Sequence, residues 1–169
     1  MDLNILRKIS YGMYIITSCD GDRINGQFAN TAFQTTSEPP TIAISINKLN
    51  YTHEIISKGG VFAVTILEKE APLKLIGQFG FKSGRDGSKF ENIKYDLKAT
   101  KCPIILEHSI GYMEAKLIST LDVGTHTIFV GEIVGAEMFA DVEPMTYAYY
   151  HEVKRGTTHK NAPTFIKQG

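Results

Sequence analysis

The sequence has no tryptophan, only two cysteines, and no excess of charge of either sign. Cys19 and Cys102 lie far apart in the chain and belong to no Cys-x-x-Cys motif, which excludes a rubredoxin-type iron site and a zinc ribbon within this sequence. Isolated cysteines of this kind indicate reduced thiols of a cytoplasmic protein rather than a disulfide framework, and we expect Cys19 to be inert packing.

The balance of basic and acidic residues argues against one class of partner, nucleic acids. Eighteen basic residues match eighteen acidic ones, so the basic surface of a nucleic-acid-binding protein is not expected. No charged-then-apolar leader and no long apolar run occur, so we expect neither a signal peptide nor a membrane span. With 169 residues and 43% hydrophobic residues, we expect one globular domain over residues 1–169, with residues 147–169 as a C-terminal tail.

Several catalytic and cofactor motifs are also missing. No G-x-G-x-x-G lies at a strand–helix junction, and no G-x-x-x-x-G-K-[ST] occurs, which argues against a dinucleotide-binding Rossmann fold and a P-loop. The five histidines show no metal-ligand spacing, so we expect no metal site. No nucleophile–base pattern is readable, and we expect no catalytic side chain.

The residues that are present favour strands. Asp20-Gly21-Asp22 is a tight-turn signal between two β-rich segments and predicts a hairpin. Strands are expected at residues 11–18, 24–36, 41–47, 61–67, 110–121 and 125–139, and helices at residues 2–9, 51–58 and 71–79. Several strands with hairpin turns and few helices indicate an antiparallel barrel or sandwich.

Polar side chains crowd the segment around Asn30, Thr31 and Thr35. The simplest interpretation is a solvated loop at a strand bend. The alternative is that these groups, with Ser45 and Asn47 at the end of the next strand, hydrogen-bond the polar edge of an isoalloxazine ring. In that case apolar neighbours such as Phe33 would pack on the faces of the ring.

The corner that follows this strand carries the second candidate site. Asn50 or Thr52 is a plausible N-cap of the helix at residues 51–58. These residues either cap the helix and do nothing more, or the helix N-terminus and Lys48 together bind a phosphate.

The loop at residues 82–89 carries Lys82, Arg85 and Lys89 among small residues. It is either a solvated, mobile loop or a lid that meets the phosphates of a nicotinamide dinucleotide or an acidic partner surface. His126 lies in a hairpin, where a lone histidine is more often structural.

Four segments together resemble the flavin reductase-like family of FMN-binding split barrels, and most of all flavoredoxins and the flavin domain of high-molecular-weight rubredoxins. They span essentially the whole chain: NGQFANTAFQTTSEPPTIAISINKLNYTHEII, SGRDGSKFEN, VGTHTIFVGEIV and YAYYHEVKRGTTHKNAPTF. The segment Gln27-Phe28-Ala29-Asn30 departs from the more methionine- and serine-rich version of many members, which leaves the substrate range open. Because the Cys-x-x-Cys unit is missing, the chain would be a stand-alone or truncated relative of those rubredoxins.

The resemblance implies a split antiparallel β-barrel with a few short helices, which dimerises and binds FMN near the dimer interface. It places Lys82, Arg85, Lys89 and His126 around the open face of the flavin, where NAD(P)H or a redox partner would approach. The cofactor contacts that it implies are Asn30, Thr31, Ala32, Phe33, Thr35, Ser45, Ile46 and Asn47, with Lys48, Tyr51 and Thr52 near the phosphate.

Three functions follow as hypotheses. The first is an NAD(P)H-dependent flavin reductase, in which Asn30, Thr31 and backbone amides stabilise the negative charge that reduction puts on the flavin. The second is a flavin electron carrier that serves a rubredoxin-type protein and reacts poorly with nicotinamides. The third is a ligand-binding barrel without redox turnover.

Overall fold

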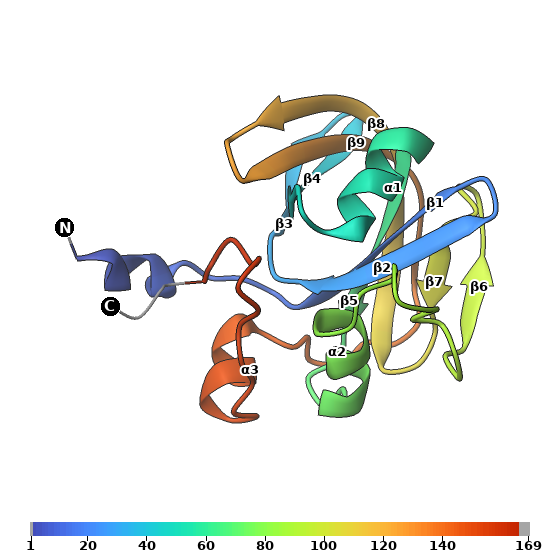
Figure 1. Cartoon of the computed structure of the whole chain (residues 1–169). Helices are drawn as coiled ribbons and strands as arrows, with labels where there is room; N and C mark the ends of the chain where they lie inside the picture. Colours follow the sequence, from blue (N-terminus) through green and yellow to red (C-terminus); the bar gives the residue numbers. More distant parts are fainter. Residues whose placement is uncertain (1, 166–169) are drawn as a thin grey trace.

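Seven antiparallel strands form the main sheet in the order β2-β1-β5-β8-β9-β4-β3, and the sheet curls into a split barrel (Figure 1). The computed structural model describes residues 2–165, apart from the side chains of residues 3, 4 and 7. The strands of the main sheet are β1 (Tyr14–Asp20), β2 (Arg23–Ala29), β3 (Ala32–Ser37), β4 (Pro40–Asn47), β5 (Val61–Leu67), β8 (Ser109–Asp122) and β9 (His126–Met138). These strands confirm the mainly β prediction.

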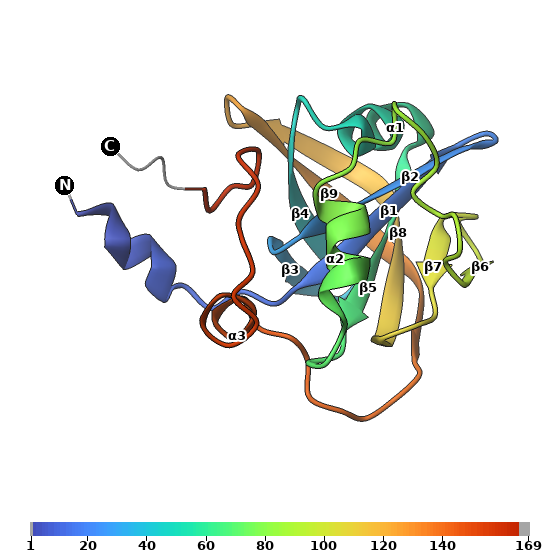
Figure 2. The ribbon, with the colours of Figure 1, turned by 60° about the horizontal axis from the view of Figure 1, so that its bottom comes forward.

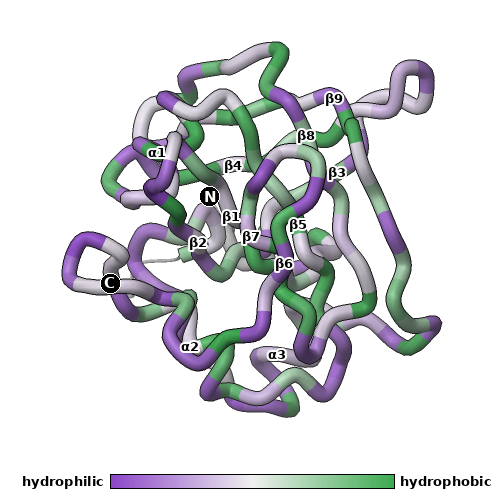
Figure 3. The backbone as a smooth tube through the Cα atoms, turned by 90° about the vertical axis from the view of Figure 1, so that its right-hand side faces the viewer, coloured by the Kyte–Doolittle hydropathy of each residue, from purple (hydrophilic) through white to green (hydrophobic). Residues whose placement is uncertain are grey.

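The chain also forms four short helices and a small second sheet within the described residues. The helices are α1 (Tyr51–Gly59), α2 (Leu73–Gly80), α3 (Tyr147–Glu152) and a 3-10 helix η1 (Leu3–Lys8), and the second sheet pairs β6 (Tyr95–Leu97) with β7 (Pro103–Ile105). Within residues 2–165, no helix is long and apolar enough to cross a membrane. Hydrophobic and hydrophilic stretches alternate along the trace (Figure 3).

Two glycines determine where a strand and a helix end, as the sequence predicts. Gly21 has φ +59° in the turn that joins β1 to β2, a conformation that residues with a side chain rarely adopt. Gly60 ends α1 in the left-handed region at φ +66°, and its amide donates to the Ile56 carbonyl. The hairpin and the helix stop are both confirmed.

The prediction of one strand over residues 24–36 is wrong. The chain leaves β2 at Ala29, bends at Asn30 and Thr31, and enters β3, and these two strands are the opposite ends of the sheet order. The bend is stabilised by side chains, because the Thr31 hydroxyl donates to Asn30 Oδ1 and Asn30 Nδ2 donates to Thr164. This crossing, from one end of the sheet to the other, brings polar groups to the rim of the barrel.

The prediction of an amphipathic helix over residues 2–9 is also wrong, because its apolar side chains do not pack against the barrel. η1 is a single short 3-10 helix, and Ile5 and Leu6 remain exposed. Two views show η1 projecting away from the barrel, on the same side as the end of the described C-terminal segment (Figures 1 and 2). The apolar spacing of this segment therefore does not serve the core.

Three clusters of buried side chains form the core. One fills the barrel and contains Ile44, Ile46, Phe62 and Phe129. A second lies under α2 and α3, and a third lies between the main sheet and the β6–β7 sheet. The alternation of β-branched and aromatic residues in the strands accounts for this burial, since alternate side chains point to the same face of a strand.

The third cluster brings the two cysteines together. Cys19 near the end of β1 and Cys102 just before β7 are 83 residues apart in the chain, and their sulfur atoms are 3.9 Å apart. Both are free thiols, as the sequence predicts, but they are neighbours in space rather than isolated residues.

Candidate functional site

A cavity of about 210 Å³ opens where four parts of the chain meet. Its walls come from β2, the corner between β4 and α1, the loop after α2, and residues 157–163 of the C-terminal segment. Eight of the residues predicted to contact the flavin, NAD(P)H or a redox partner line it: Asn30, Ser45, Asn47, Tyr51, Thr52, Lys82, Arg85 and Lys89. The fold thus brings the polar bend, the strand end and the basic loop to one place.

Other candidate residues from the polar bend do not line this cavity. Ile46 is fully buried in the barrel core, and Phe33 on β3 is 53% exposed and away from the cavity. The Thr35 hydroxyl shares a hydrogen bond with Thr41. Ala32 packs against the barrel core. Phe33 therefore cannot pack on the face of a ring bound in this cavity, because its side chain is not part of the lining.

Thr31 and Lys48 also lie outside the cavity. The carbonyl of Thr31 accepts from the amide of Ser45, so this residue joins the bend to β4 rather than facing the cavity. Lys48 Nζ lies 2.6 Å from Asp122 Oδ2, in an exposed ion pair. The β4–β9 pairing sets this direction, because the end of β9 at His126 lies opposite Asn47.

The N-terminus of α1 faces the cavity without a side-chain cap. Asn50 occupies the N-cap position, but its side chain makes no capping bond. Its Nδ2 donates to Gln27 Oε1, and its Oδ1 accepts from Asn161 Nδ2. Thr52 is buried and accepts from Asn25 Nδ2. The His53 amide donates to the Asn50 carbonyl, whereas the amides of Tyr51 and Thr52 have no side-chain cap and keep their partial positive charge available to an anion.

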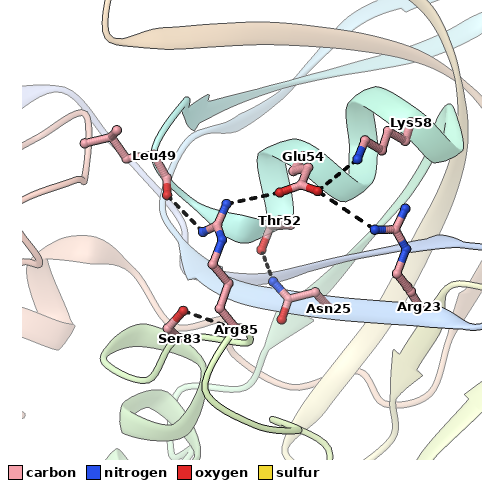
Figure 4. A network of polar contacts seen from close by, with 8 residues as sticks. All are labelled: Arg23, Asn25, Leu49, Thr52, Glu54, Lys58, Ser83 and Arg85. Atoms are coloured by element: carbon pink, nitrogen blue, oxygen red, sulfur yellow. Dashed lines mark hydrogen bonds and ion pairs between the residues drawn. The ribbon is translucent and has the colours of Figure 1, made fainter.

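Arg85 ties the basic loop to α1, as Figure 4 shows. Its guanidinium donates to the Leu49 carbonyl and to Glu54, and it lies 4.8 Å from the centre of the Tyr51 ring. Glu54 also pairs with Lys58 on its own helix, and these cations hold the pKa of its carboxyl below the usual range. The loop is thus held against the helix N-terminus rather than lying free in solvent.

Lys89 is a buried cation in the wall of the cavity. Its Nζ donates to the carbonyls of Gly26 at 2.9 Å and Phe79 at 3.1 Å. No carboxylate pairs with it among the described residues, and burial lowers its pKa to about 8. The family resemblance implies a place for Lys89 around the open face of the flavin, whereas the structure places it inside, joining β2 to the end of α2.

This burial makes a prediction about pH. Between about pH 8 and 10.5, Lys89 is neutral in the folded protein but charged in the unfolded chain, so the unfolded state binds more protons. The free energy of unfolding should therefore rise over this range, by at most about 3 kcal/mol from Lys89. Below pH 8 both states are protonated and Lys89 contributes no slope.

Urea denaturation of the wild type and of Lys89→Met at pH 7, 8, 9 and 10 measures this contribution. Tyrosines and cysteines whose pKa is raised by burial act in the opposite direction, so the difference between the two proteins isolates Lys89. The wild type should gain stability relative to the variant as the pH rises. A constant difference would contradict the burial of a charged lysine.

The C-terminal segment forms a wall that the sequence analysis missed. His159 packs edge-on against Phe81, and the Tyr150 hydroxyl donates to the Thr157 carbonyl. Asn161 bonds to Asn50, and its carbonyl lies 3.1 Å from His126 Nε2. His126 itself lines a shallower hollow beside the cavity, together with Ser45 and Asn47. The sequence predicts residues 147–169 only as a C-terminal tail, with no role in a cavity wall.

All the charged side chains that line the cavity are cations. Lys82, Arg85 and Lys89 line it, and no aspartate or glutamate does so among the described residues. His159 also lines it, and burial and the nearby Lys160 and Lys89 lower its pKa, which keeps it neutral. In a chain with no net charge, this local excess favours an anionic ligand.

No group of three or more metal-ligating side chains is positioned to hold a metal ion in the part of the chain that the structure describes. The polar groups of the cavity are amides, hydroxyls and cations, which suit hydrogen bonding to an organic anion.

Comparisons with known proteins show the family of this chain. The family model described as flavin reductase like domain matches residues 6–158. The high molecular weight rubredoxin of Moorella thermoacetica is 56% identical over 98% of this chain and 72% of that protein. The ferric-chelate reductase (NAD(P)H) of Archaeoglobus fulgidus is 44% identical over 99% of both chains. The solved structure of flavin reductase HpaC with NADP+ superposes with a TM-score of 0.73, at 28% identity, over 85% of this chain and 89% of that chain.

Proposed function

We infer, because the chain belongs to the flavin reductase-like domain family, that it is an FMN-dependent oxidoreductase acting as one domain over residues 1–169. It accepts a hydride or electrons on FMN, with NAD(P)H as the donor, and passes them to free flavin or to a redox partner. The NAD(P)H-dependent relative and the FMN-binding relatives support this donor and this cofactor. The observation that carries the proposal is the cavity lined by cations beside the uncapped N-terminus of α1.

The residues of the cavity fit the chemistry of FMN. Arg85 and the amides of α1 would hold the phosphate. Arg85 bonds Leu49 and Glu54 through two of its five N–H groups, which leaves other donors for an anion. Asn30, Ser45 and Asn47 offer polar groups to the ring edge, and Phe28 offers an apolar surface. At about 210 Å³ the cavity is smaller than the roughly 300–1,000 Å³ of most ligand sites. Part of the ring would therefore lie at the mouth, unless residues 157–163 move.

When bound, FMN supplies the hydride and electron chemistry, and the chain supplies position and electrostatics. Arg85, held by Leu49 and stacked on Tyr51, would fix the phosphate end. The buried Lys89 adds a positive potential inside the cavity, which favours negative charge on a reduced ligand. No side chain is needed as a nucleophile.

Anaerobic mixing of the FMN-loaded protein with NADH or NADPH tests the donor. Rapid loss of the absorbance of oxidised flavin, within the turnover time of a reductase, is the expected result. Retention of the absorbance with both nicotinamides, followed by its loss on adding a reduced rubredoxin-type protein, would contradict direct NAD(P)H oxidation and support a carrier.

A carrier function is the second candidate, and one observation favours it. The relative with 56% identity is named a high molecular weight rubredoxin, and the chain covers 72% of its length. A rubredoxin-type protein would then exchange electrons with FMN at the mouth of the cavity. The same mixing experiment decides between the two functions.

We also propose that the protein is a homodimer in the cytoplasm. The exposed side chains Phe33, Ile118, Leu121 and Val123 leave apolar surface on β3 and on the β8–β9 hairpin, which supports association. The two free thiols support a reducing compartment. Light scattering after gel filtration should give twice the mass of one chain, and a monomer at micromolar concentration would contradict the dimer.

A further inference from the structure

The two cysteines form a buried pair that the flavin chemistry does not use. Cys19 Sγ and Cys102 Sγ lie 3.9 Å apart between the main sheet and the β6–β7 sheet. We propose that they are an oxidisable dithiol, which closes a disulfide between β1 and the segment before β7 when a hydroperoxide reaches it. This proposal does not depend on flavin binding.

The backbone on the Cys102 side is fixed by buried hydrogen bonds. Glu114 on β8 is 1% exposed and accepts from the amides of Ala99 and Thr100 and from the Thr100 hydroxyl. The Thr17 hydroxyl donates to the Pro103 carbonyl at 2.6 Å, which joins β1 to the residue after Cys102. The two segments that carry the cysteines are therefore hydrogen-bonded to each other. This bond lies no more than two residues from either cysteine along the chain.

The anchoring keeps the two sulfur atoms within reach of bond formation. A disulfide needs a sulfur–sulfur distance of about 2.05 Å, so the pair must approach by about 1.9 Å from 3.9 Å. Rotation of the two side chains supplies such a movement. The contact that is given up, from Cys19 Sγ to the Thr100 carbonyl at 3.3 Å, is weak because a thiol is a weak hydrogen-bond donor.

The two thiols differ in access. Cys19 is 7% exposed, whereas Cys102 is fully buried. Burial raises the pKa of both thiols, so the reactive thiolate is scarce at neutral pH and oxidation is slow. Only a small oxidant fits this environment, and Cys19 meets it first.

The reaction balances with one hydroperoxide. The Cys19 thiolate attacks the peroxide oxygen, the O–O bond breaks, and an alcohol or water leaves with the proton that Cys19 has lost. Cys102 Sγ then attacks Cys19 Sγ, the S–O bond breaks, and the hydroxyl group leaves as water with the proton of Cys102. The peroxide gains two electrons, and the two thiols lose one electron and one proton each.

Oxidation of the folded wild-type protein with hydrogen peroxide, followed by denaturation in iodoacetamide and mass spectrometry, tests the pair. The expected product has lost two hydrogens, carries no alkyl groups, and yields a linked peptide of Cys19 and Cys102 after unreduced digestion. Reduction should restore two alkylation sites. The melting temperature should rise on oxidation, because the crosslink closes a long loop of the unfolded chain.

Cys19→Ser and Cys102→Ser are the controls, and each should lose the linked peptide and the rise in melting temperature. The proposal is overturned if, in the wild type, both cysteines alkylate after oxidation or Cys19 becomes sulfinic acid without the linked peptide. Crosslinked dimers in place of the internal link overturn it as well. Because the wild-type result decides, failure of a serine variant to fold leaves the test intact.

Discussion

Replacing Arg85 with alanine should weaken FMN binding by roughly 10- to 100-fold, because a charge-assisted hydrogen bond contributes about 1.5–3 kcal/mol. Its half-exposed side chain places the effect toward the lower end of this range. Folding should change by less than about 1 kcal/mol, since the pair of Arg85 with Glu54 lies at the surface. Quenching of FMN fluorescence measures the affinity.

Lys48→Ala is the matched control for this substitution. Lys48 is also a cation near the corner between β4 and α1, but it pairs with Asp122 outside the cavity. FMN affinity in this variant should stay within about twofold of the wild type. If Lys48→Ala weakens FMN binding and Arg85→Ala does not, the phosphate lies beside Lys48, outside the cavity.

Replacing Glu114 with alanine should destabilise the protein by about 3–4 kcal/mol. Glu114 is buried and is the acceptor for three donors of the segment at Ala99 and Thr100. Leaving the buried amide and hydroxyl of Thr100 without a partner costs about 1–3 kcal/mol each. A loss of this size is a large part of the total stability of a small domain. Urea denaturation measures this loss in the free energy of unfolding, provided that its slope against urea concentration is the same in both proteins.

Glu132→Ala is the control, because this carboxylate lies on the neighbouring strand β9 and is exposed. Its loss should change stability by less than about 0.5 kcal/mol. Glu114→Gln should lie between the two, since the amide keeps one acceptor oxygen. Equal losses in the alanine variants at residues 114 and 132 would contradict the structural role of Glu114.

Much of the fold can be predicted from local patterns. Alternating apolar residues and turn signals at Gly21 and Gly60 define β1, β2 and the end of α1, because these signals depend only on neighbouring residues. A polar bend near Asn30 can be predicted in this way, but the placement of the strands on its two sides at opposite ends of the sheet cannot. A run of β-branched and polar residues reads as one strand, and only the closure of the sheet separates β2 from β3.

The residues of the candidate site also divide into those that the sequence predicts and those that depend on long-range contacts. Asn47, Thr52 and Arg85 line the cavity as the sequence and the family resemblance suggest. The direction of Lys48 depends on Asp122, which reaches it only through the pairing of β4 with β9. The wall formed around Asn161 depends on contacts across more than a hundred residues, and no local signal predicts them.

The most direct test is an FMN titration of the purified protein, with an absorption spectrum after gel filtration. We expect the yellow flavin bands to elute with the protein, at one FMN per chain, and the bound fraction to fall in Arg85→Ala but not in Lys48→Ala. A colourless protein that leaves all added FMN in the small-molecule fraction would contradict flavin binding in this cavity.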